Sequence, residues 1–599
     1  MIKIPTPQAH GLRLALASAA LSAYLAVFLE WFFFATTPSY LSSIKLTDRL
    51  LILALTPLPL ATLTSAATLV VWAMALAAKA SHAIKTRLAM TIPAFLAASA
   101  LLVACDNVTY TLFSVGTITI QNGARYAYGG LFLFLLFIAW LEMLRLSAWL
   151  ERMGKIRLFT GITASVVMVS FILFPIKMVG RWYATTVRSA PLNARPDIFL
   201  ISVDALHAVN LPPYGAPPEK APFLAAWSKE AFVFKNAFCN GNWTASSLPS
   251  VLTGKSPLTL KKFSSEQILR GRDAYEHLPG LLRQNGYRAV QIGYDHHADA
   301  RDWNMLEAFD VVNELPEKRV FLLNFNNVVF SRFNEAAYFL NTAIYRGTAR
   351  LAHGFGGHKT SSRWFSNGNA RAYYQNDDER VADFAAQLAR FPGEPVFFQV
   401  HLVRTHNIME FETRQGIRWS QELYEERIRG VDADFKNMIE TIKKSGRYEN
   451  AAIVFYSDHS LANTTTVRLP LIMRLPGAPP IADLSTNVQN LDIAPTLLDY
   501  LGTDVPAYME GVSLLKPLDP QRVIFSAFSA RYTHKPTHFF AILCQTGFVF
   551  TLDNYALNAF RIARDGACPP GSSALHEKAK GQMIKLLADA GLLKDRNER

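Results

Sequence analysis

The chain has 599 residues, of which half are hydrophobic and 18% are charged, and its formal net charge is +13 at pH 7. Charged residues are sparse up to about residue 180 and have an ordinary density beyond it. Because the length exceeds that of an ordinary domain, this distribution excludes one uniform soluble domain. It predicts a membrane part at 1–180, a linker at 181–196 and a soluble part at 197–599.

Five apolar stretches in the first part are long enough to cross a bilayer as helices, which takes about 20 residues each. They lie at roughly 14–36, 50–78, 89–113, 127–149 and 157–179. The first is too long, and too closely followed by the others, to be a cleaved signal peptide. We therefore expect an N-terminal bundle of five transmembrane helices.

Basic residues in the short loops predict the orientation of this bundle, because Lys and Arg gather on the cytoplasmic side. With the N-terminus inside, nine basic residues fall in inner segments and three in outer loops. The inner ones are Lys3, Arg13, Lys79, Lys85, Arg87, Arg145, Arg152, Lys155 and Arg157, and the outer ones are Lys45, Arg49 and Arg125. The soluble part is therefore expected outside the cytoplasm, and the positive charge requires no nucleic-acid partner.

The soluble part alternates strand and helix patterns. Runs rich in Ile, Val and Phe occur at 196–206, 287–295, 395–402, 451–459 and 469–477. Helical patterns lie between or after them at 222–232, 276–286, 377–391, 422–446 and 491–502. This alternation predicts an α/β domain with a mostly parallel central sheet and helices on both faces. Functional groups are expected at the carboxyl ends of the strands, where Asp204, His401, Asp458 and His459 fall.

Residues 196 to 515 resemble the sulfatase/alkaline-phosphatase superfamily. The resemblance rests on the order and spacing of several segments: ISVDALHAVNLPPYG, APFLAAWSKEAFVFKNAF, YSDH, LPLIMRLPG, LDIAPTLLDYLG and EGVSLL. Five crossings ahead of such a domain resemble its membrane-bound branch, which includes lipid A phosphoethanolamine transferases and lipoteichoic acid synthases. The resemblance implies a protein of the bacterial cytoplasmic membrane with its catalytic domain on the periplasmic side.

The stretch NWTASSLPSVLTG, residues 242–254, resembles the nucleophile segment of this superfamily. Sulfatases carry Cys or Ser in a Cys/Ser-x-Pro-x-Arg signature that is oxidised to formylglycine. Neither that Pro nor that Arg stands in the window Thr244-Ala-Ser-Ser-Leu. It is instead similar to the Thr-Ala-x-Ser-x-Pro of phosphoethanolamine transferases, matched by Thr244, Ala245, Ser247 and Pro249. The resemblance therefore implies that Thr244 carries a phosphoryl group.

A Thr hydroxyl is a poor nucleophile unless a base or a metal ion activates it. The resemblance assigns Asp204, Thr244, Asp458 and His459 as ligands of a divalent metal, because oxygen and imidazole ligands suit zinc, with manganese as the alternative. The competing interpretation is that they are strand-end caps and turn residues. The family's His-x-x-x-x-His pattern implies that His406, in HLVRTH, binds phosphate or acts as a general acid. We interpret His401 as structural.

Arg404 in the same segment is a candidate phosphate ligand, or simply a solvated loop residue. The sequence also departs from the transferase pattern: Asp204 replaces the usual Glu, position 207 is His, and the later histidines have no counterpart. A second metal and the acid for the leaving group therefore stay open. The histidines that could substitute are His207, His296, His297, His353 and His358.

Two acids in the predicted membrane part are unexpected, because ionisable groups there are costly and persist with a partner or a function. Glu30 and Asp106 lie in the outer parts of the first and third crossings. They are candidates to hold the ammonium of a phosphoethanolamine donor; the alternative is that each simply reaches the membrane interface or pairs with Arg125 or Arg181. Cys544 and Cys568 either form a disulfide or stay as free thiols. Residues 320–375 are interpreted as an insertion near the site.

The resulting hypothesis is a monomeric, metal-dependent transferase. It would move phosphoethanolamine from a phospholipid donor to an outer-surface glycolipid or glycan acceptor through phospho-Thr244. A phosphoglycerol transferase, a membrane-anchored phosphodiesterase or sulfatase-like hydrolase, and a non-catalytic scaffold are the alternatives.

Overall fold

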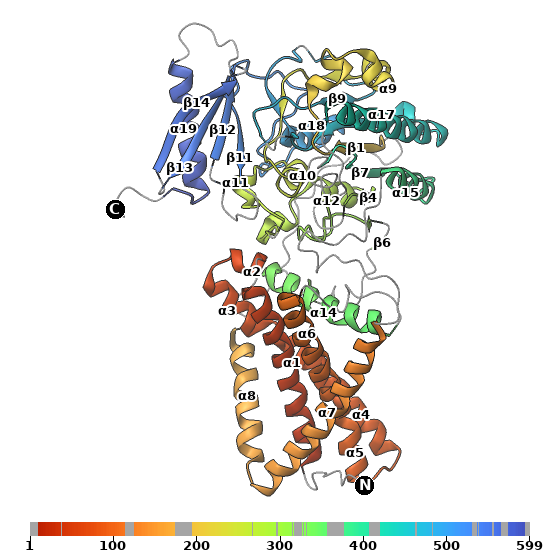
Figure 1. Cartoon of the computed structure of the whole chain (residues 1–599), viewed down its shortest axis with the longest axis vertical. Coiled ribbons are helices and arrows are strands. Elements are labelled where there is room, and N and C mark those ends of the chain that lie inside the picture. Colours follow the sequence, from red (N-terminus) through yellow and green to blue (C-terminus); the bar gives the residue numbers. More distant parts are fainter. Residues whose placement is uncertain are drawn as a thin grey trace. The chain divides into compact units, whose positions relative to one another are not determined.

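The structure is a computed structural model of the whole chain (Figure 1). It describes residues 10–36, 39–113, 125–173, 195–406 with gaps at 266, 295–297, 314, 317–325, 328, 331 and 356–376, 420–529 with gaps at 462–463 and 482, 536, and 538–593 with gaps at 545, 554–555 and 565–572. The chain forms two compact units. The first combines Met1–Arg181 with Arg319–Tyr373, and the second combines Trp182–Lys318 with Tyr374–Arg599.

The first unit is helical. Its described N-terminal helices are α1 (Gly11–Thr36), α2 (Tyr40–Ser43), α3 (Leu46–Leu55), α4 (Pro57–Ala77), α5 (His82–Ala89), α6 (Thr91–Phe113), α7 (Arg125–Arg152) and α8 (Ile156–Leu173). Five of the described stretches are long and apolar enough to cross a membrane: Gly11–Thr36, Leu46–Ala77, His82–Thr109, Arg125–Arg152 and Ile156–Leu173. The predicted five-helix bundle is therefore confirmed as far as length and composition can show it.

The central helix of this bundle is α1, which packs against both α4 and α6. Ala15, Ala19 and Ala23 recur every fourth position and are completely buried. Small side chains at this spacing let neighbouring helices approach closely, which is how helices pack where no water drives them together. Large apolar residues such as Phe32, Met74 and Phe134 are instead exposed, as expected of lipid-facing positions.

The inner loops of the predicted topology share one end of the bundle. Leu14 at the start of α1, Ala89 at the end of α5 and Leu150 near the end of α7 belong to one buried cluster. The indole of Trp140 donates a hydrogen bond to the carbonyl of Arg87 at 3.0 Å. The basic segments around Lys85 and Arg152 therefore lie on the same side of the first unit, as the charge asymmetry predicts.

The segment 320–375 belongs mostly to a different unit of the structure from the one that the sequence predicts. Its described part includes helix α14 (Asn334–Gly354), which packs on α6, α7 and α3 of the first unit. Residues Arg319–Tyr373 therefore belong to the helical unit, although the sequence places them inside the soluble range 197–599. The reason is that α14 carries basic side chains that match acids of the bundle, a tertiary relation with no trace in local sequence. The expected linker 181–196 lies almost wholly outside the described residues.

The second unit contains an eight-stranded sheet in the order β2-β9-β8-β1-β7-β4-β5-β6. The strands are β1 (Ile198–Val203), β2 (Phe232–Val233), β4 (Arg288–Ile292), β5 (Val311–Val312), β6 (Leu315–Pro316), β7 (Val396–Leu402), β8 (Ala452–Ser457) and β9 (Leu471–Arg474). The central run β8-β1-β7-β4-β5 is parallel, which confirms the mostly parallel sheet. Strand β9 runs antiparallel to β8, and the described part of the connection from Ser457 to Leu471 contains no helix.

Helices cover both faces of this sheet (Figure 1). Helices α9 (Pro222–Trp227), α15 (Asp377–Ala389) and α17 (Gln421–Lys444) contribute to one core, and α10 (Thr244–Thr253), α12 (Leu278–Gln284) and α18 (Ile493–Tyr500) to the other. Along β1, Ile198 and Leu200 point into the second core while Phe199 and Ile201 point into the first. Burial on both faces explains why the strands are continuously apolar rather than alternating.

Beyond residue 515 the chain forms a separate small sheet that the strand and helix patterns named above do not include. Strands β11 (Ile524–Phe528), β12 (His538–Leu543), β13 (Thr546–Asp553) and β14 (Ala556–Arg564) are consecutive and antiparallel, and α19 (Ser573–Asp589) packs on them. Cys568 lies outside the described residues, so its pairing with Cys544 stays a prediction.

Candidate active site

The candidate site lies at the carboxyl edge of the central strands. Asp204 follows β1, and Asp458 and His459 follow β8. The parallel register aligns Val203 with Ser457, so the next residues, Asp204 and Asp458, emerge side by side. Strand ends and helix N-termini converge at such an edge, and the geometry brings these predicted site residues together there.

Thr244 joins these residues from the first position of α10. Its Oγ1 lies 3.4 Å from Oδ2 of Asp204 and 3.3 Å from Nε2 of His459. The hydroxyl of Ser247, one turn into the helix, donates to the carbonyl of Asp458 at 2.6 Å and fastens α10 to the end of β8. The N-terminus of a helix favours negative charge, so an anionic group on Thr244 would be stabilised.

Helix α10 is buried on every side. All ten of its residues are buried, so no face is exposed to solvent and its apolar residues need not be confined to one stripe. The helix ends at Gly254, whose φ of 66° lies in the left-handed region, a common helix stop.

The two carboxyl groups have opposite pKa shifts. Burial alone would raise the pKa of Asp204, but the imidazoles of His406 and His459 outweigh it and hold that pKa well below its ordinary value. Burial raises the pKa of Asp458; His459 opposes this shift and the nearby Asp204 carboxylate adds to it. The site therefore keeps Asp204 ionised at neutral pH and concentrates charge that a cation or imidazolium must balance.

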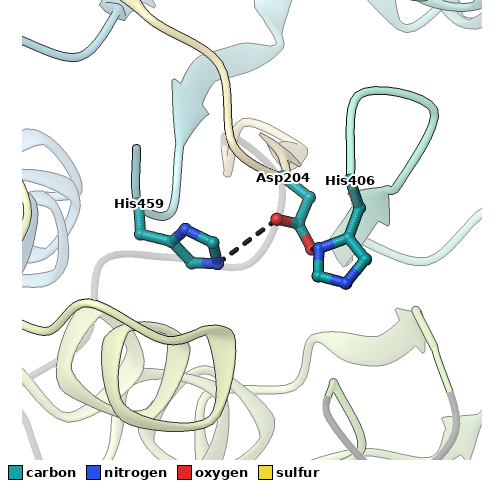
Figure 2. A group of neighbouring side chains, drawn as sticks. All are labelled: Asp204, His406 and His459. Carbon is teal, nitrogen blue, oxygen red and sulfur yellow. Dashed lines mark ion pairs between the residues drawn. The ribbon is translucent and has the colours of Figure 1, made fainter. Parts of the chain in front are cut away.

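Figure 2 shows Asp204 between two imidazoles. Nδ1 of His406 lies 2.9 Å from Oδ2 of Asp204, and Nε2 of His459 lies 3.2 Å from Oδ1. The side chain of His406 is 41% exposed, whereas those of Asp204 and His459 are at most 4% exposed. The structure thus brings His406 to the predicted set and places it on the solvent side.

His401, which the sequence reading treats as structural, also belongs to this cluster. It is 1% exposed, and its Nε2 lies 3.4 Å from Asp204 Oδ2 and 3.9 Å from Asp458 Oδ2. Strand β7 lies directly beside β1, with His401 in register with Ser202. Its position near the end of a strand indicates that His401 lies at this edge of the sheet. That it contacts the cluster follows only from the pairing of β7 with β1.

Arg404 is engaged elsewhere. Its guanidinium donates to both oxygens of Asp434 at 2.8 and 3.0 Å and to Asp378 at 2.8 Å. Burial opposes its charge, but these carboxylates raise the pKa of Arg404 above its ordinary value. The structure therefore supports neither a phosphate ligand nor a loosely solvated side chain: Arg404 is a bridge between the β7 loop and α17.

The other candidate histidines contribute less. Nε2 of His207 accepts a hydrogen bond from the Leu461 amide at 3.0 Å, and burial lowers its pKa. His353 lies on α14 in the first unit. His296, His297 and His358 lie outside the described residues.

Glu30 and Asp106 lie in the first unit and are paired with arginines of α14. Glu30 Oε2 is 3.1 Å from Arg346 Nε, and Asp106 Oδ2 is 2.5 Å from Arg350 Nε. The Asn107 side chain accepts hydrogen bonds from both guanidinium groups. Each acid is thus paired with an arginine, but with Arg346 and Arg350 rather than with the predicted Arg125; the other predicted partner, Arg181, lies outside the described residues. Binding of a donor ammonium by these acids would require the ion pairs to open.

The residues at the strand ends fit a divalent metal. Two overlapping groups, Asp204 with His406 and His459 and Asp204 with His401 and Asp458, place their ligand atoms within 4.8 Å of one another. Oδ1 of Asp204 and Oδ2 of Asp458 are buried and accept no hydrogen bond from the described residues. Buried carboxylate oxygens are costly without a partner, and a cation would satisfy both. Carboxylate and imidazole donors are compatible with several divalent metals.

Comparison with known proteins identifies the family. The model of the family described as Sulfatase matches residues 196–503, slightly more than half of the chain. An ulvan-active sulfatase from Formosa agariphila is 22% identical over 354 residues, covering 54% of this chain and 55% of the relative. The N-acetylglucosamine-6-O-sulfatase of Bacteroides thetaiotaomicron is 32% identical over 101 residues, covering 15% and 18% of the two chains. The chain thus spans about half the length of the first of these relatives.

Solved structures are similar at a modest level. A phosphonate monoester hydrolase from Silicibacter pomeroyi is 17% identical, with a TM-score of 0.47 and coverage of 66% of this chain and 96% of that one. The phosphonate monoester hydrolase of Agrobacterium radiobacter is 18% identical, with a TM-score of 0.45 and coverage of 66% and 96%. With its family model matched from β1 to α18 and its acidic and imidazole groups gathered at the ends of β1, β7 and β8, this chain belongs to the sulfatase family.

Proposed function

We propose that the protein is a metal-dependent transferase of substituted phosphoryl groups that uses Thr244 as its nucleophile. The observation that carries this proposal is the position of Thr244 Oγ1, at the N-terminus of α10 and within 3.4 Å of both Asp204 and His459. A hydroxyl aimed at a cluster of metal-type ligands is the arrangement that nucleophilic catalysis by Thr requires.

The residues around Thr244 favour phosphorus over sulfur as the centre of reaction. A Thr cannot be oxidised to the formylglycine on which sulfatases depend. Ser246 and Leu248 stand where the sulfatase signature has Pro and Arg, and Leu248 is completely buried in the core beneath the sheet. No guanidinium therefore extends from this position toward the nucleophile, whereas the Thr hydroxyl can itself form a phosphate ester.

The proposed reaction proceeds in two displacements. Thr244 Oγ attacks the phosphorus of a phosphodiester donor, the bond between phosphorus and the lipid oxygen breaks, and the head group remains as a Thr244 ester. An acceptor hydroxyl then attacks the same phosphorus and releases Thr244. A divalent metal, zinc or manganese, held by Asp204, Asp458 and His459, would lower the pKa of the Thr hydroxyl and neutralise phosphoryl charge.

Protons move in opposite directions in the two displacements. The first needs a base for the Thr244 proton and an acid for the departing lipid oxygen. Nε2 of His459, 3.3 Å from Oγ1, is the atom that would bind the metal, so the Thr244 proton passes to solvent once the pKa of the hydroxyl is lowered. His406, the partly exposed member of the cluster, is placed to protonate the leaving oxygen and to exchange that proton with solvent. Acceptor attack reverses both transfers.

The five apolar helices support a lipid as donor. A hydrolase of soluble esters needs no such bundle, whereas a lipid donor is confined to the membrane. We propose phosphoethanolamine as the transferred group, a phospholipid as donor and an outer-surface glycolipid or glycan as acceptor. The proposed location is the bacterial cytoplasmic membrane, with the second unit on its periplasmic side and the chain acting as a monomer.

A second candidate function is hydrolysis of phosphate or sulfate esters, which the sulfatase names of the curated relatives favour. Both functions would use the same cluster and differ in the acceptor, which is water in hydrolysis. Product analysis separates them: transfer yields diacylglycerol and a modified acceptor, whereas hydrolysis yields the free head-group phosphate or sulfate.

Trapping the Thr244 ester tests the proposal directly. We expect full-length protein incubated with isotope-labelled phosphatidylethanolamine, without acceptor, to gain a labelled phosphoethanolamine on the peptide that contains Thr244. Thr244→Ala should lose the label and reduce transfer by roughly three orders of magnitude or more, and Thr244→Ser should retain both in part. Full transfer by Thr244→Ala would exclude the nucleophile. Labelled product from wild type with water as sole acceptor would favour hydrolysis.

A further inference from the structure

His401 is the residue of the cluster whose role the family resemblance leaves unexplained. It lies on the central strand β7, between β1 and β4, with its side chain 1% exposed. Position 205, directly after Asp204, is Ala and offers no side-chain ligand. The side chains that face Asp204 within the sheet therefore come from neighbouring strands, and His401 is one of them.

The hydrogen bonds of the His401 ring indicate where its lone pair points. Ser202 donates its hydroxyl proton to the carbonyl of Val400 at 3.0 Å. Its oxygen is then available to accept from Nδ1 of His401 at 2.9 Å. With the proton on Nδ1, Nε2 carries the lone pair, and it points at Oδ2 of Asp204 at 3.4 Å and Oδ2 of Asp458 at 3.9 Å.

His459 repeats this arrangement with a backbone partner. Its Nδ1 lies 3.0 Å from the carbonyl of Ser460, which can only accept, so Nδ1 carries the proton. Its Nε2 then presents a lone pair, when the ring is neutral, to Asp204 Oδ1 at 3.2 Å and Asp458 Oδ2 at 3.6 Å. A hydrogen bond from one ring nitrogen commonly orients a metal-binding imidazole in this way.

Lone pairs and carboxylate oxygens that converge in a buried space repel one another unless a cation lies among them. Oδ2 of Asp458 faces both imidazoles at 3.6 and 3.9 Å and accepts no hydrogen bond from the described residues. In the other tautomer of His401, Nε2 would donate to Asp204 and could not bind metal. The two tautomers of His401 therefore predict different affinities of the protein for a metal ion, which can be measured.

We infer that His401 is a ligand of the active-site metal, together with Asp204 and Asp458, and that Ser202 is the positioning residue that fixes its tautomer. This inference rests on the metal chemistry of the proposed function and adds a strand-borne imidazole to the ligand set. The metal would then be held from three adjacent strands, β8, β1 and β7, rather than from two.

Metal binding by the full-length protein in detergent provides the test, with Zn²⁺ affinity measured by chelator competition and the Co²⁺ absorption spectrum recorded. We expect His401→Ala and His401→Gln to weaken Zn²⁺ binding by about 100-fold and to change the Co²⁺ ligand-field bands. Ser202→Ala should weaken binding about 10-fold, because the imidazole loses its orientation. His538→Ala, a histidine of β12 in the C-terminal sheet, serves as the matched control and should bind like wild type.

The outcomes separate the inference from the proposed function. Wild-type metal binding with unchanged affinity and spectrum in both His401 variants would overturn the inference and leave the proposed function standing. A wild-type protein that binds neither Zn²⁺ nor Co²⁺ would overturn both. Thermal unfolding of the chelated, metal-free proteins identifies a variant that binds less because it is misfolded, and His401→Gln, which keeps most of the side-chain volume, replaces His401→Ala in that case.

Discussion

At the residue scale, the loop that carries His406 is held in place by hydrogen bonds and an ion pair. The charged side chains that form them lie outside the cluster around Asp204. The Asp377 carboxylate accepts hydrogen bonds from the backbone amides of Val403 and Arg404 at 2.7 to 3.0 Å. The Arg404 side chain forks onto Asp434 of α17, and the Thr405 hydroxyl donates to the carbonyl of Asp204. These contacts fix the course of the chain immediately before His406.

The bidentate ion pair between Arg404 and Asp434 leads to a prediction about catalysis. Arg404→Gln should reduce kcat by about 10-fold to 100-fold with little change in KM, because a misplaced catalytic group costs rate. Asp434→Asn should give a similar loss, and the double variant should be no worse than either single variant, since both remove one interaction. Kinetics of all three measure this. An Asp434→Asn enzyme of normal kcat beside an impaired Arg404→Gln would point to direct phosphate binding by Arg404.

At the element scale, α14 is attached to the apolar helices of the first unit by ion pairs that water does not reach. The side chains of Arg350 and Asp106 are completely buried, and those of Arg346 and Glu30 are 1% and 6% exposed. The guanidinium of Arg346 also lies over the rings of Phe33 and Phe34. Removing one member of such a pair leaves an uncompensated buried charge.

Breaking one of these pairs should therefore destabilise the first unit strongly. We expect Glu30→Gln to cost about 3 to 5 kcal/mol, and Glu30→Gln combined with Arg346→Met to cost less than Arg346→Met alone. Glu142→Gln is the matched control, because its pair with Arg145 is half exposed and contributes about 1 kcal/mol or less. Protease accessibility of α14 in detergent reports the loss. Similar effects at Glu30 and Glu142 would contradict a buried clamp.

A second element, α12, connects stability to pH. Nδ1 of His277 accepts from the Gly280 amide at 3.0 Å and caps the helix, while Nε2 faces the carbonyls of Ala274 and Leu306 at 3.2 and 3.0 Å. Burial lowers the pKa of His277 to about 4. Its ordinary value in an unfolded chain is about 6.5, so between these values the unfolded chain takes up the proton and the folded helix does not.

The stabilising contribution of neutral His277 is therefore complete above pH 6.5 and is lost as the pH falls toward 4, by on the order of 3 kcal/mol. Hydrogen exchange of the α12 amides across this pH range, corrected for intrinsic rates, measures it. His277→Asn keeps a capping oxygen but does not titrate, and its exchange should depend less on pH. An unchanged slope in that variant would assign the effect to other groups.

At the scale of the whole molecule, the orientation in the membrane depends on basic loops that the structure places at one end of the first unit. A reporter that works only outside the cytoplasm should be active when fused after Arg599 and inactive when inserted near Lys85. The physical reason is the excess of Lys and Arg in the loops of that end. Fluorescence or enzymatic activity of the two fusions measures it, and the reverse pattern would place the second unit in the cytoplasm.

Much of the architecture follows from the sequence alone, because it depends on local patterns. Five apolar stretches of about the thickness of a bilayer can only be buried in lipid or in protein, and apolar runs alternating with helical patterns favour a parallel sheet. Asp204, Asp458 and His459 could be predicted as neighbours, because residues at the carboxyl ends of parallel strands share one edge. Thr244 could be added only through the family resemblance.

Only the tertiary structure decided which residues far apart in the chain become neighbours. His401 enters the cluster because β7 pairs with β1, and Arg404 leaves it because Asp434 of α17 lies within reach. Glu30 and Asp106 find their partners in Arg346 and Arg350, separated from them by 316 and 244 positions. Local sequence records a charge or an imidazole but not its neighbour, since strand order and helix docking are set by burial of the whole chain.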